Sequence, residues 1–509
     1  MRSRPVGPLP LASTYASGQD HVGEGTGLVT TQAAILIWGT QLSLEHHSAL
    51  HLHPDAPVLL IESKSICTRF KYHKQKLAFV LTSMREYADE LVAVGRVVHY
   101  VHLPDSDDWF VSLEQLCRQQ AISQLIVMRQ NDRAPQRGIE AWCKAHAIAL
   151  EVTPNTQFLT SAAEFTQWAG TQKQFKMEQF YRWQRARLGI LLDNDGKPQG
   201  GAWNYDAENR KPLPKDAVLP KIPFPAPSGH RSDILELIER HFGDHPGETD
   251  VNWLPTTRAQ AREWLTDFID NRFASFGDYE DAMLKGETFL YHSATSALLN
   301  IGLLHPSEVV AAALAADVPL ASKEGFIRQI IGWREFVFGM YHLKPATWKS
   351  ENYLQHTAAL PDWWWQLEGA SEPPLEDVLS RLKEFGYSHH IERLMVLGNY
   401  MLLARYDPRE VYDWFMTMYV DSYEWVMVPN IIGMSQYADG GLDNGGFATK
   451  PYISGSNYLQ KMGKWWPTTA ASKESAWTSM YWDFLSFHED VLANNYRLRP
   501  LYNRGKKST

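Results

Sequence analysis

Cysteine is scarce in this chain of 509 residues, which has only Cys67, Cys117 and Cys143. No two of them form a C-x-x-C pair, and three thiols cannot build the disulfide framework of a small secreted domain. The sequence also lacks an apolar run of about 18 residues and the apolar core of a secretory signal. These absences exclude a disulfide scaffold, predict no membrane association and favour the cytoplasm.

An excess of positive charge is absent as well. Lys and Arg number 49 against 58 Asp and Glu, a formal net charge of −9, which excludes a protein that coats nucleic acid over its whole surface. Residues 450–509 are the exception, with nine Lys and Arg against four Asp and Glu. Such segregation suits docking of phosphate groups on one face. The 44% of hydrophobic residues excludes a mainly disordered chain, and 19 tryptophans are unusually many.

The first part of the chain alternates short β-branched runs with longer segments of helical period, which is typical of a doubly wound parallel sheet. We expect strands at 33–37, 58–63, 96–103 and 124–129, and helices at 72–95, 111–120 and 136–147. Neither G-x-G-x-x-G nor the P-loop motif occurs, so an ordinary dinucleotide or nucleotide site is not predicted.

Composition changes divide the chain into four regions. Six prolines between Pro212 and Pro227 indicate an extended connector. Beyond it, amphipathic helical segments dominate, which predicts a large all-α domain. The expected regions are an unstructured extension (1–29), an α/β domain (30–155), an interdomain connector (156–230) and an all-α domain (231–509).

Two helical motifs carry unusual polar side chains. Residues 325–342 mix charge and indole inside an apolar helix, through Arg328, Gln329, Trp333, Arg334 and Glu335. Buried charge needs a partner or a ligand, although a solvated helix face is the alternative. In 386–400, His389 and His390 adjoin an apolar helix, where a histidine can act as a proton donor or serve only a structural role.

Two further motifs resemble cofactor-binding segments. Residues 421–441 join Gly and Asn to buried aromatics, as a loop lining a cofactor would. In 289–304, Ser293, Thr295 and Ser296 stand at a helix start, where hydroxyl and N–H groups can bind phosphate. Helix capping by the same side chains is the competing account, and the two are compatible.

Together these segments resemble the photolyase and cryptochrome family, and in particular its prokaryotic (6-4) photolyase branch, the iron–sulfur bacterial cryptochromes and photolyases. The resemblance runs from about Ile35 to Tyr502. Its motifs are YHKQKLAFV (72–80), GGAWNYDAENRKP (200–212), IRQIIGWREF (327–336), HHIERLM (389–395), VPNIIGMSQYADGG (428–441), TKPY (449–452) and YWDFL (481–485).

The resemblance implies FAD in the helical domain, and light-driven electron transfer from reduced FAD to a DNA lesion flipped out of the duplex. It places Ser293, Thr295 and Ser296 at the diphosphate and Asp421 beside the isoalloxazine. The position facing flavin N5, often Asn or an acid in relatives, is Met427. The flavin pocket would be lined by Gln329, Trp333 and Arg334, the last as a fixed cation beside a flavin that becomes anionic on reduction.

For the lesion, the resemblance implies that His390, with His389 beside it, donates the proton to the (6-4) photoproduct. Side chains expected to pack against the flipped bases are Leu394, Met434 and Tyr452. Asp206 and Glu208 match an interdomain segment near the lesion, and their carboxylates suit Mg²⁺. Structural packing is the alternative for each of these residues.

Flavin photoreduction in the family uses a relay of aromatic side chains. The resemblance aligns Trp365 with the inner tryptophan and Trp414 with the next. Relatives place a tyrosine after the latter, whereas this chain has Phe415, which has no phenolic proton. We therefore expect a different exit, through Tyr412 or another tryptophan.

Two cofactors of the branch meet departures in this sequence. A [4Fe–4S] cluster needs about four Cys thiolates, but the matching positions lie near Pro374, Trp466, Thr469 and Ser475, so we expect no iron–sulfur ligands. Aromatic packing is predicted to replace the cluster, through Trp465, Trp466, Trp477 and Trp482.

The other cofactor is the antenna, 6,7-dimethyl-8-ribityllumazine, which we expect in the α/β domain because the motif KYHKQKLAF is kept. Thr40 and Ile66 stand where the branch has acidic residues. The dense histidines His46, His47, His51 and His53 indicate a solvated loop rather than a metal site, since no supporting pattern accompanies them.

The sequence thus predicts a monomeric blue-light-driven (6-4) photolyase that acts on UV-damaged DNA. A cryptochrome-like photoreceptor, a cyclobutane pyrimidine dimer photolyase and a non-enzymatic flavin-binding interaction protein are the alternatives. Presence of His390, Tyr452 and the basic C-terminal segment favours repair.

Elemental analysis tests the cluster prediction. Because all three cysteines precede residue 144, the purified protein should contain flavin and no iron. Stoichiometric iron that survives a chelating column would show that ligands other than cysteine hold a cluster.

Overall fold

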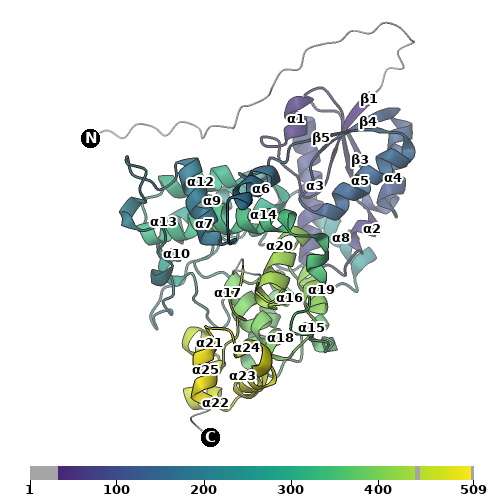
Figure 1. Ribbon diagram of the computed structural model, residues 1–509. Helices are drawn as coiled ribbons and strands as arrows, with labels where there is room; N and C mark the ends of the chain where they lie inside the picture. Colours follow the sequence, from purple (N-terminus) through teal and green to yellow (C-terminus); the bar gives the residue numbers. More distant parts are fainter. Residues whose placement is uncertain (1–31, 442–446, 506–509) are drawn as a thin grey trace.

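The computed structural model describes residues 32–441 and 447–505. An α/β domain and a larger helical domain lie side by side (Figure 1). The predicted unstructured extension, residues 1–29, lies outside the described residues. None of the described helices has the length and apolar character that crossing a bilayer requires.

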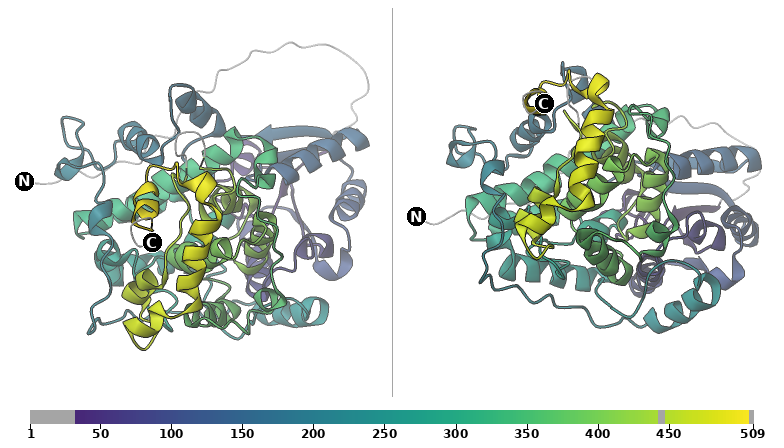
Figure 2. Two further views of the ribbon diagram at one scale, coloured as in Figure 1. Left: turned by 60° about the horizontal axis from the view of Figure 1, so that its bottom comes forward. Right: turned by 90° about the horizontal axis from the view of Figure 1, so that it is seen from below.

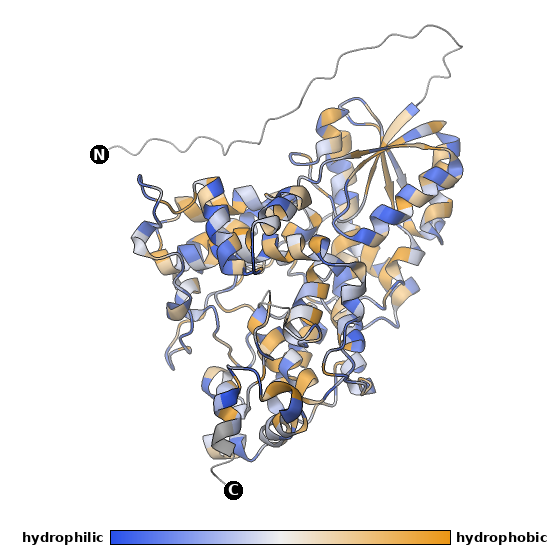
Figure 3. Ribbon diagram, viewed as in Figure 1, coloured by the Kyte–Doolittle hydropathy of each residue, from blue (hydrophilic) through white to orange (hydrophobic). Residues whose placement is uncertain are grey.

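A five-stranded sheet forms the centre of the α/β domain. All neighbouring pairs are parallel, in the order β3-β2-β1-β4-β5, which confirms the predicted doubly wound sheet. The strands are β1 (Gln32–Ile37), β2 (Val58–Ile61), β3 (Val98–Val101), β4 (Ile122–Met128) and β5 (Ala149–Thr153). Strand β2, which has a neighbour on each side, is buried on both faces, as its continuous apolar run requires. The strands stand out as hydrophobic in Figure 3.

Helices cover both faces of this sheet (Figure 1). They are α1 (Ser48–Leu52), α2 (Lys64–Cys67), α3 (Lys74–Ala93), α4 (Trp109–Gln119) and α5 (Arg133–His146), with the short 3₁₀ turn η1 (Leu103–Asp105). The segment predicted as a helix over 72–95 is therefore helical from Lys74. Asp108 caps α4 by accepting from the N–H groups of Phe110 and Val111, which explains its sharp start.

Beyond the sheet, the regular elements of the described chain are helices, as predicted. The first of these helices are α6 (Ala162–Gly170), α7 (Met177–Leu188), α8 (Arg231–Phe242), α9 (Arg258–Asn271), α10 (Phe273–Tyr279), α11 (Ser296–Ile301), α12 (Pro306–Ala315), α13 (Leu320–Ile327) and α14 (Glu335–Leu343). Then follow α15 (Asp362–Gln366), α16 (Pro373–Phe385), α17 (His390–Glu392), α18 (Asn399–Leu403), α19 (Pro408–Met418), α20 (Glu424–Met427), α21 (Ser456–Gly463), α22 (Thr469–Lys473), α23 (Ala476–Phe487), α24 (Glu489–Leu492) and α25 (Arg499–Gly505). Residues 189–230 form a largely irregular connection between α7 and α8.

Short irregular turns join these helices. The 3₁₀ turns are η2 (Gln199–Gly201), η3 (Asp206–Glu208) and η5 (Ala346–Ser350), and the π-helical turns are η4 (Arg328–Arg334), η6 (Arg393–Gly398) and η7 (Val428–Ser435). Helix α7, within the predicted connector, packs against η4 and so joins the helical domain. The C-terminal helices, yellow in Figure 2, lie on the side of the helical domain away from the sheet.

His73, at the start of α3, ties the two domains together. Its Nδ1 accepts from the N–H of Gln75 at 3.1 Å, and its Nε2 lies 3.1 Å from the carbonyl oxygen of Lys383 in the helical domain. Gly247 makes this approach possible, because a Cβ there would lie 2.0 Å from Nε2 of His73, and its φ of +84° disfavours other residues.

Gly247→Ala should therefore lower the free energy of unfolding by about 3 kcal/mol, through overpacking against His73 and backbone strain. Gly95→Ala is the matched control, since Gly95 has a φ of +85° and a Cβ added there would meet no atom within 4 Å. Urea unfolding measures both variants. Equal losses would show that the approach to His73 contributes nothing beyond the backbone strain.

Candidate functional site

Three of the motifs singled out in the sequence share an unexpected local feature. IRQIIGWREF and VPNIIGMSQ contain the π-helical turns η4 and η7, and HHIERLM ends within the π-helical turn η6. Such turns widen a helix, leave the ordinary hydrogen-bond ladder and occur often at functional sites. All three predicted motifs are thus locally distorted.

An ion pair that is largely shielded from water joins η6 to Asp421, the first residue of the 421–441 motif. Arg393, at the start of η6, donates from Nη1 and Nη2 to the two carboxylate oxygens of Asp421, at 2.8 and 3.0 Å. Its Nε donates to the carbonyl oxygen of Ser388 at 2.7 Å, and its guanidinium lies 4.1 Å from the ring centre of Tyr419. Bidentate pairing fixes the plane of both groups.

Asp421 also binds the segment predicted to hold phosphate. Ser296 Oγ donates to its carboxylate at 2.6 Å, and Asn300 Nδ2 donates to its backbone carbonyl at 2.9 Å. Although burial alone would raise the pKa of Asp421, Arg393 and Ser296 hold that pKa below its ordinary value. The carboxylate is therefore ionised at neutral pH.

The Ser293–Ser296 segment has free capacity for a ligand. Ser293 and Thr295 share a hydrogen bond of 3.0 Å between their hydroxyls, and the Thr295 side chain does not cap α11. Capping, the alternative considered for these hydroxyls, is therefore not observed for Thr295. Ala294 is held at a φ of +49°, and such strained backbone clusters at functional sites.

The two adjacent histidines occupy different environments. His389 is buried, and its ring stacks on that of His292 with centroids 4.3 Å apart. Burial, together with His292 and Arg381, puts the pKa of His389 far below its ordinary value, so this ring stays neutral. His390 is exposed to solvent, although surrounding protein and Arg393 lower its pKa to about 4. Of the two, only His390 can meet a ligand from solvent.

The residues predicted to contact flipped bases belong to one hydrophobic cluster. Leu394 and Met434 are buried in it, and Tyr452 and Trp333 pack against it while partly buried. Arg497 and Arg210 lie near enough to lower the pKa of Tyr452, although burial raises it overall. Two arginines and the acid Asp206 thus lie near Tyr452.

Gln329 lies in a group of acidic side chains rather than beside Asp421. Its Nε2 donates to Glu280 at 2.6 Å, and Asn209 Nδ2 donates to the other Glu280 oxygen at 2.9 Å. Arg328 Nη1 lies 3.5 Å from Asp206. Burial raises the pKa of Glu280 to about 7 and that of Asp281 to about 6. Glu280 and Asp281 were missed in the sequence because they lie far from the motifs.

Arg334 packs on an aromatic ring and contacts α11, the helix that begins at Ser296. It lies 4.0 Å from the ring centre of Phe158 and donates to the carbonyl oxygens of Gln157 and Leu299 at 3.3 and 3.4 Å. None of its described contacts reaches Asp421, whose cationic partner is Arg393. The HHIERLM motif contained Arg393, but its partner lies 28 residues further along the chain.

Three tryptophan rings, those of Trp363, Trp364 and Trp414, contact one another in sequence near the predicted relay. Trp414 donates from Nε1 to the carbonyl oxygen of Trp364 at 2.8 Å, with ring centres 5.3 Å apart, and Trp364 stacks on Trp363 at 4.5 Å. Tyr419, beside Arg393, lies 6.1 Å from Trp414. The neighbour that Trp414 contacts is thus Trp364, and no described ring contact joins it to Trp365. Met427 is buried in α20.

The tryptophan-rich C-terminal region is packed except at one position. Trp465 and Trp477 are buried and donate from Nε1 to Asp377 and to the Ser454 carbonyl, at 2.9 and 3.2 Å. Trp466 is also buried. The prediction is wrong for Trp482, which is 53% exposed, because its side of α23 faces solvent.

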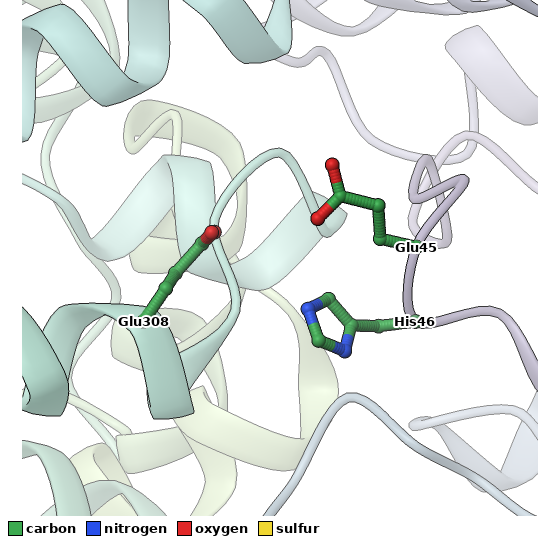
Figure 4. A group of neighbouring side chains, drawn as sticks. All are labelled: Glu45, His46 and Glu308. Atoms are coloured by element: carbon green, nitrogen blue, oxygen red, sulfur yellow. The ribbon is translucent and has the colours of Figure 1, made fainter. Parts of the chain in front are cut away.

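The histidine-rich loop is not uniformly solvated. His47 is fully buried, and His46 stacks on His305 with ring centres 3.8 Å apart. His46 lies with Glu45 and Glu308 in a group whose possible ligand atoms are within 4.8 Å of one another (Figure 4). Here the solvated-loop prediction was wrong for His46 and His47.

Arginines account for the carboxylates of this group. Arg258 donates to Glu45 and to Glu308, at 2.9 and 3.0 Å, and Arg262 donates to Glu45 at 2.9 Å. Two guanidinium groups among the carboxylates oppose a cation by charge repulsion. The group therefore joins the α/β domain to α9 and α12 by ion pairs.

Asp421→Asn should lower the free energy of unfolding by about 3 kcal/mol at pH 7, because it leaves the buried Arg393 charge unpaired. Since the pKa of Asp421 is lowered by folding, this stabilisation is present above the ordinary carboxyl pKa and is lost as the pH falls below about 4. Urea unfolding at pH 7 and about pH 3 measures the difference, because at pH 4 the loss has only begun. Asp362→Asn is the exposed control. A difference that does not shrink in acid would contradict the ion pair as its source.

Comparisons with known proteins find relatives of this chain. Residues 35–253 match the family model described as deoxyribodipyrimidine photo-lyase-related protein. A (6-4) photolyase from Agrobacterium fabrum is 34% identical over 459 residues, covering 87% of this chain and 89% of the relative.

Two solved structures share the fold. A bacterial class III photolyase from Agrobacterium tumefaciens has a TM-score of 0.54 at 19% identity, over 81% of this chain and 80% of its own. A Synechocystis cryptochrome has a TM-score of 0.56 at 14% identity, over 90% of each chain. With the long match to the Agrobacterium fabrum relative, these findings show that the chain belongs to the photolyase/cryptochrome family.

Proposed function

We propose that this protein is a light-driven DNA repair enzyme that binds FAD and reverses (6-4) pyrimidine dimers. The observation that carries the proposal is the position of His390, exposed to solvent three residues from the buried Arg393–Asp421 pair. A proton donor for a lesion thus stands beside a fixed charge pair suited to a flavin. The long match to a (6-4) photolyase supports the same activity.

Buried polar atoms without a partner in the described structure support FAD binding. They are Nε of Arg272, Nε2 of His292 and both ring nitrogens of His389; Arg272 and His389 both contact His292, the residue before Ser293. Such atoms cost free energy unless a ligand or water satisfies them. The Ser296 hydroxyl donates to Asp421, whereas Ser293 and Thr295 share one hydrogen bond and so leave one hydroxyl donor for a diphosphate. With the N–H groups at the start of α11, the residues present fit the cofactor.

When bound and reduced, FAD supplies the electron that light drives into the lesion. The chain's contribution begins with orientation, because Arg393 and Asp421 hold each other in one plane beside the cofactor segment. Arg393 keeps a positive charge where negative charge develops on reduction. We place Gln329, Trp333 and Arg334 outside this immediate group, with Trp333 on the lesion side of the site.

His390 holds the proton for the lesion on an imidazole nitrogen. With its pKa lowered to about 4 by the surrounding protein and Arg393, this ring is neutral at pH 7. A phosphate diester of bound DNA adds negative charge, which raises the histidine pKa toward neutrality. Protonation of His390 is therefore expected to follow DNA binding, while His389 stays neutral and stacked on His292.

Damaged DNA would enter over the cluster of Leu394, Met434 and Tyr452. A flipped base needs apolar and aromatic surfaces against which to pack. Arg210 and Arg497, which influence Tyr452, would then face the phosphates.

The group of Asp206, Glu280 and Asp281 is our candidate for Mg²⁺. Buried carboxyl groups with raised pKa values gain from a nearby cation, and Oδ1 of Asn209 is a buried oxygen without a described partner. Arg328 lies near Asp206 and Glu280, and Arg210 lies near Asp206 and Asp281, so an ion would bind here only by displacing one of these guanidinium groups.

The remaining parts of the proposal rest on the resemblance. They are a relay through Trp365 and Trp414, a lumazine antenna, absence of the iron–sulfur cluster, and a monomer in the cytoplasm. The contacts of Trp414 add Trp364 to the relay as the neighbouring ring.

His390→Ala should bind a (6-4) oligonucleotide with unchanged affinity but repair it about 100-fold more slowly under blue light, because the proton donor is lost. Repair is measured by chromatography of the oligonucleotide, and affinity by fluorescence anisotropy. His51→Ala, at an exposed histidine of the α/β domain, is the control. Unchanged repair by His390→Ala would remove the proton-donor role.

A further inference from the structure

The segment from Asp421 to Met427 is held by the α/β domain at two points. It starts at Asp421 and ends with the short helix α20, whose last residue is the buried Met427. Figure 1 shows α20 at the junction of the two domains. The two contacts come from Lys76, on α3, and from Asp132, just before α5.

Lys76 crosses from the α/β domain into the helical domain. Its side chain is buried, and Nζ donates to the carbonyl oxygen of Ser422 and, at 3.0 Å, to the Ser422 hydroxyl. Nζ also lies 4.6 Å from the ring centre of Tyr72 and 4.7 Å from that of Tyr423. The ammonium group thus donates hydrogen bonds to Ser422, the residue directly after Asp421, and is shielded by two aromatic rings.

Asp132 binds the segment at the start of α20. Its two carboxylate oxygens accept from the backbone N–H groups of Trp425 at 2.7 Å and Glu424 at 3.3 Å. These are the first N–H groups of α20, which have no partner within the helix. A carboxylate from the other domain therefore serves as the helix cap, the role that a local Ser or Asp usually fills.

The charges around Lys76 come from every element packed against it. Asp421 and Asp132 favour its ammonium form and Arg69 opposes it, while Tyr72 and Tyr423 contribute their rings. Because burial outweighs the two acids, the pKa of Lys76 falls to about 7. Burial and Glu424 raise the pKa of Asp132 to about 6. Both groups are charged near pH 6.5 and can change charge close to it.

We propose that Lys76 and Asp132 are positioning residues, through which the α/β domain holds Asp421 and Met427 in the geometry that binds the flavin. This inference rests on the proposed FAD binding. It assigns the motif YHKQKLAFV to domain coupling, since His73 and Lys76 of that motif both contact the helical domain.

The first test is local hydrogen exchange of the protein without flavin. Lys76→Met keeps the length of the side chain and removes the ammonium group, so the backbone amides of 422–427 should exchange about tenfold faster. Those of α12 should not change. Lys71→Met is the matched control, because Lys71 is exposed and its ion pair among the described residues is with the exposed Asp244.

The second test is FAD affinity as a function of pH, measured by quenching of flavin fluorescence between pH 6 and 8.5. Wild-type affinity should fall as the pH rises through about 7, where Lys76 loses its charge. In Lys76→Met, affinity should be about tenfold weaker at pH 6 and should lose this pH dependence.

Asp132→Asn provides an independent variant, because an amide oxygen can accept only part of what the carboxylate accepts. It should speed exchange at the Glu424 and Trp425 amides. It should also move the fall in FAD affinity to lower pH, because the Asp132 charge favours the ammonium form of Lys76. Unchanged exchange at 422–427 in Lys76→Met, or an unchanged pH profile, would overturn the proposal. Failure of the wild-type protein to bind FAD would instead overturn the proposed function, and the exchange result would still decide the coupling.

Discussion

A salt bridge buried away from water is the constraint on which the site depends. Removing the Arg393 and Asp421 charges from water costs several kcal/mol, a cost offset only by close geometry and further hydrogen bonds. The structure meets both conditions, since Ser388 and Ser296 complete the donors and acceptors. Because these partners come from separate segments, satisfying one pair of charges fixes η6, α11 and the segment after Tyr419 relative to one another.

The same requirement explains the contact between the domains. The segment from Asp421 to Met427 starts at a buried carboxylate and leads into the short helix α20. Its backbone carbonyl and N–H groups need hydrogen-bond partners. Lys76 and Asp132 provide them from the α/β domain, and His73 and the Glu45–Arg258 pairs secure the interface elsewhere. The sheet domain therefore contributes to the structure of the site.

The sequence predicted the doubly wound sheet and the helical second part, because hydrophobic periodicity reports local structure directly. It also led to His390 and Asp421 through motifs that are contiguous in the chain. Arg393 was missed because its role depends on a partner 28 residues away, and Trp364 because three adjacent tryptophans differ only in direction. The π-helical turns leave the apolar pattern almost unchanged, so periodicity could not reveal them.

The central claim is that this site repairs (6-4) lesions by light. The most direct measurement is repair by the wild-type, flavin-loaded, reduced protein of oligonucleotides that carry one (6-4) lesion or one cyclobutane dimer, under blue light and in the dark. The account predicts light-dependent loss of the (6-4) lesion alone. Loss of the cyclobutane dimer alone, or no repair of either lesion, would contradict it, and the latter result would favour a photoreceptor.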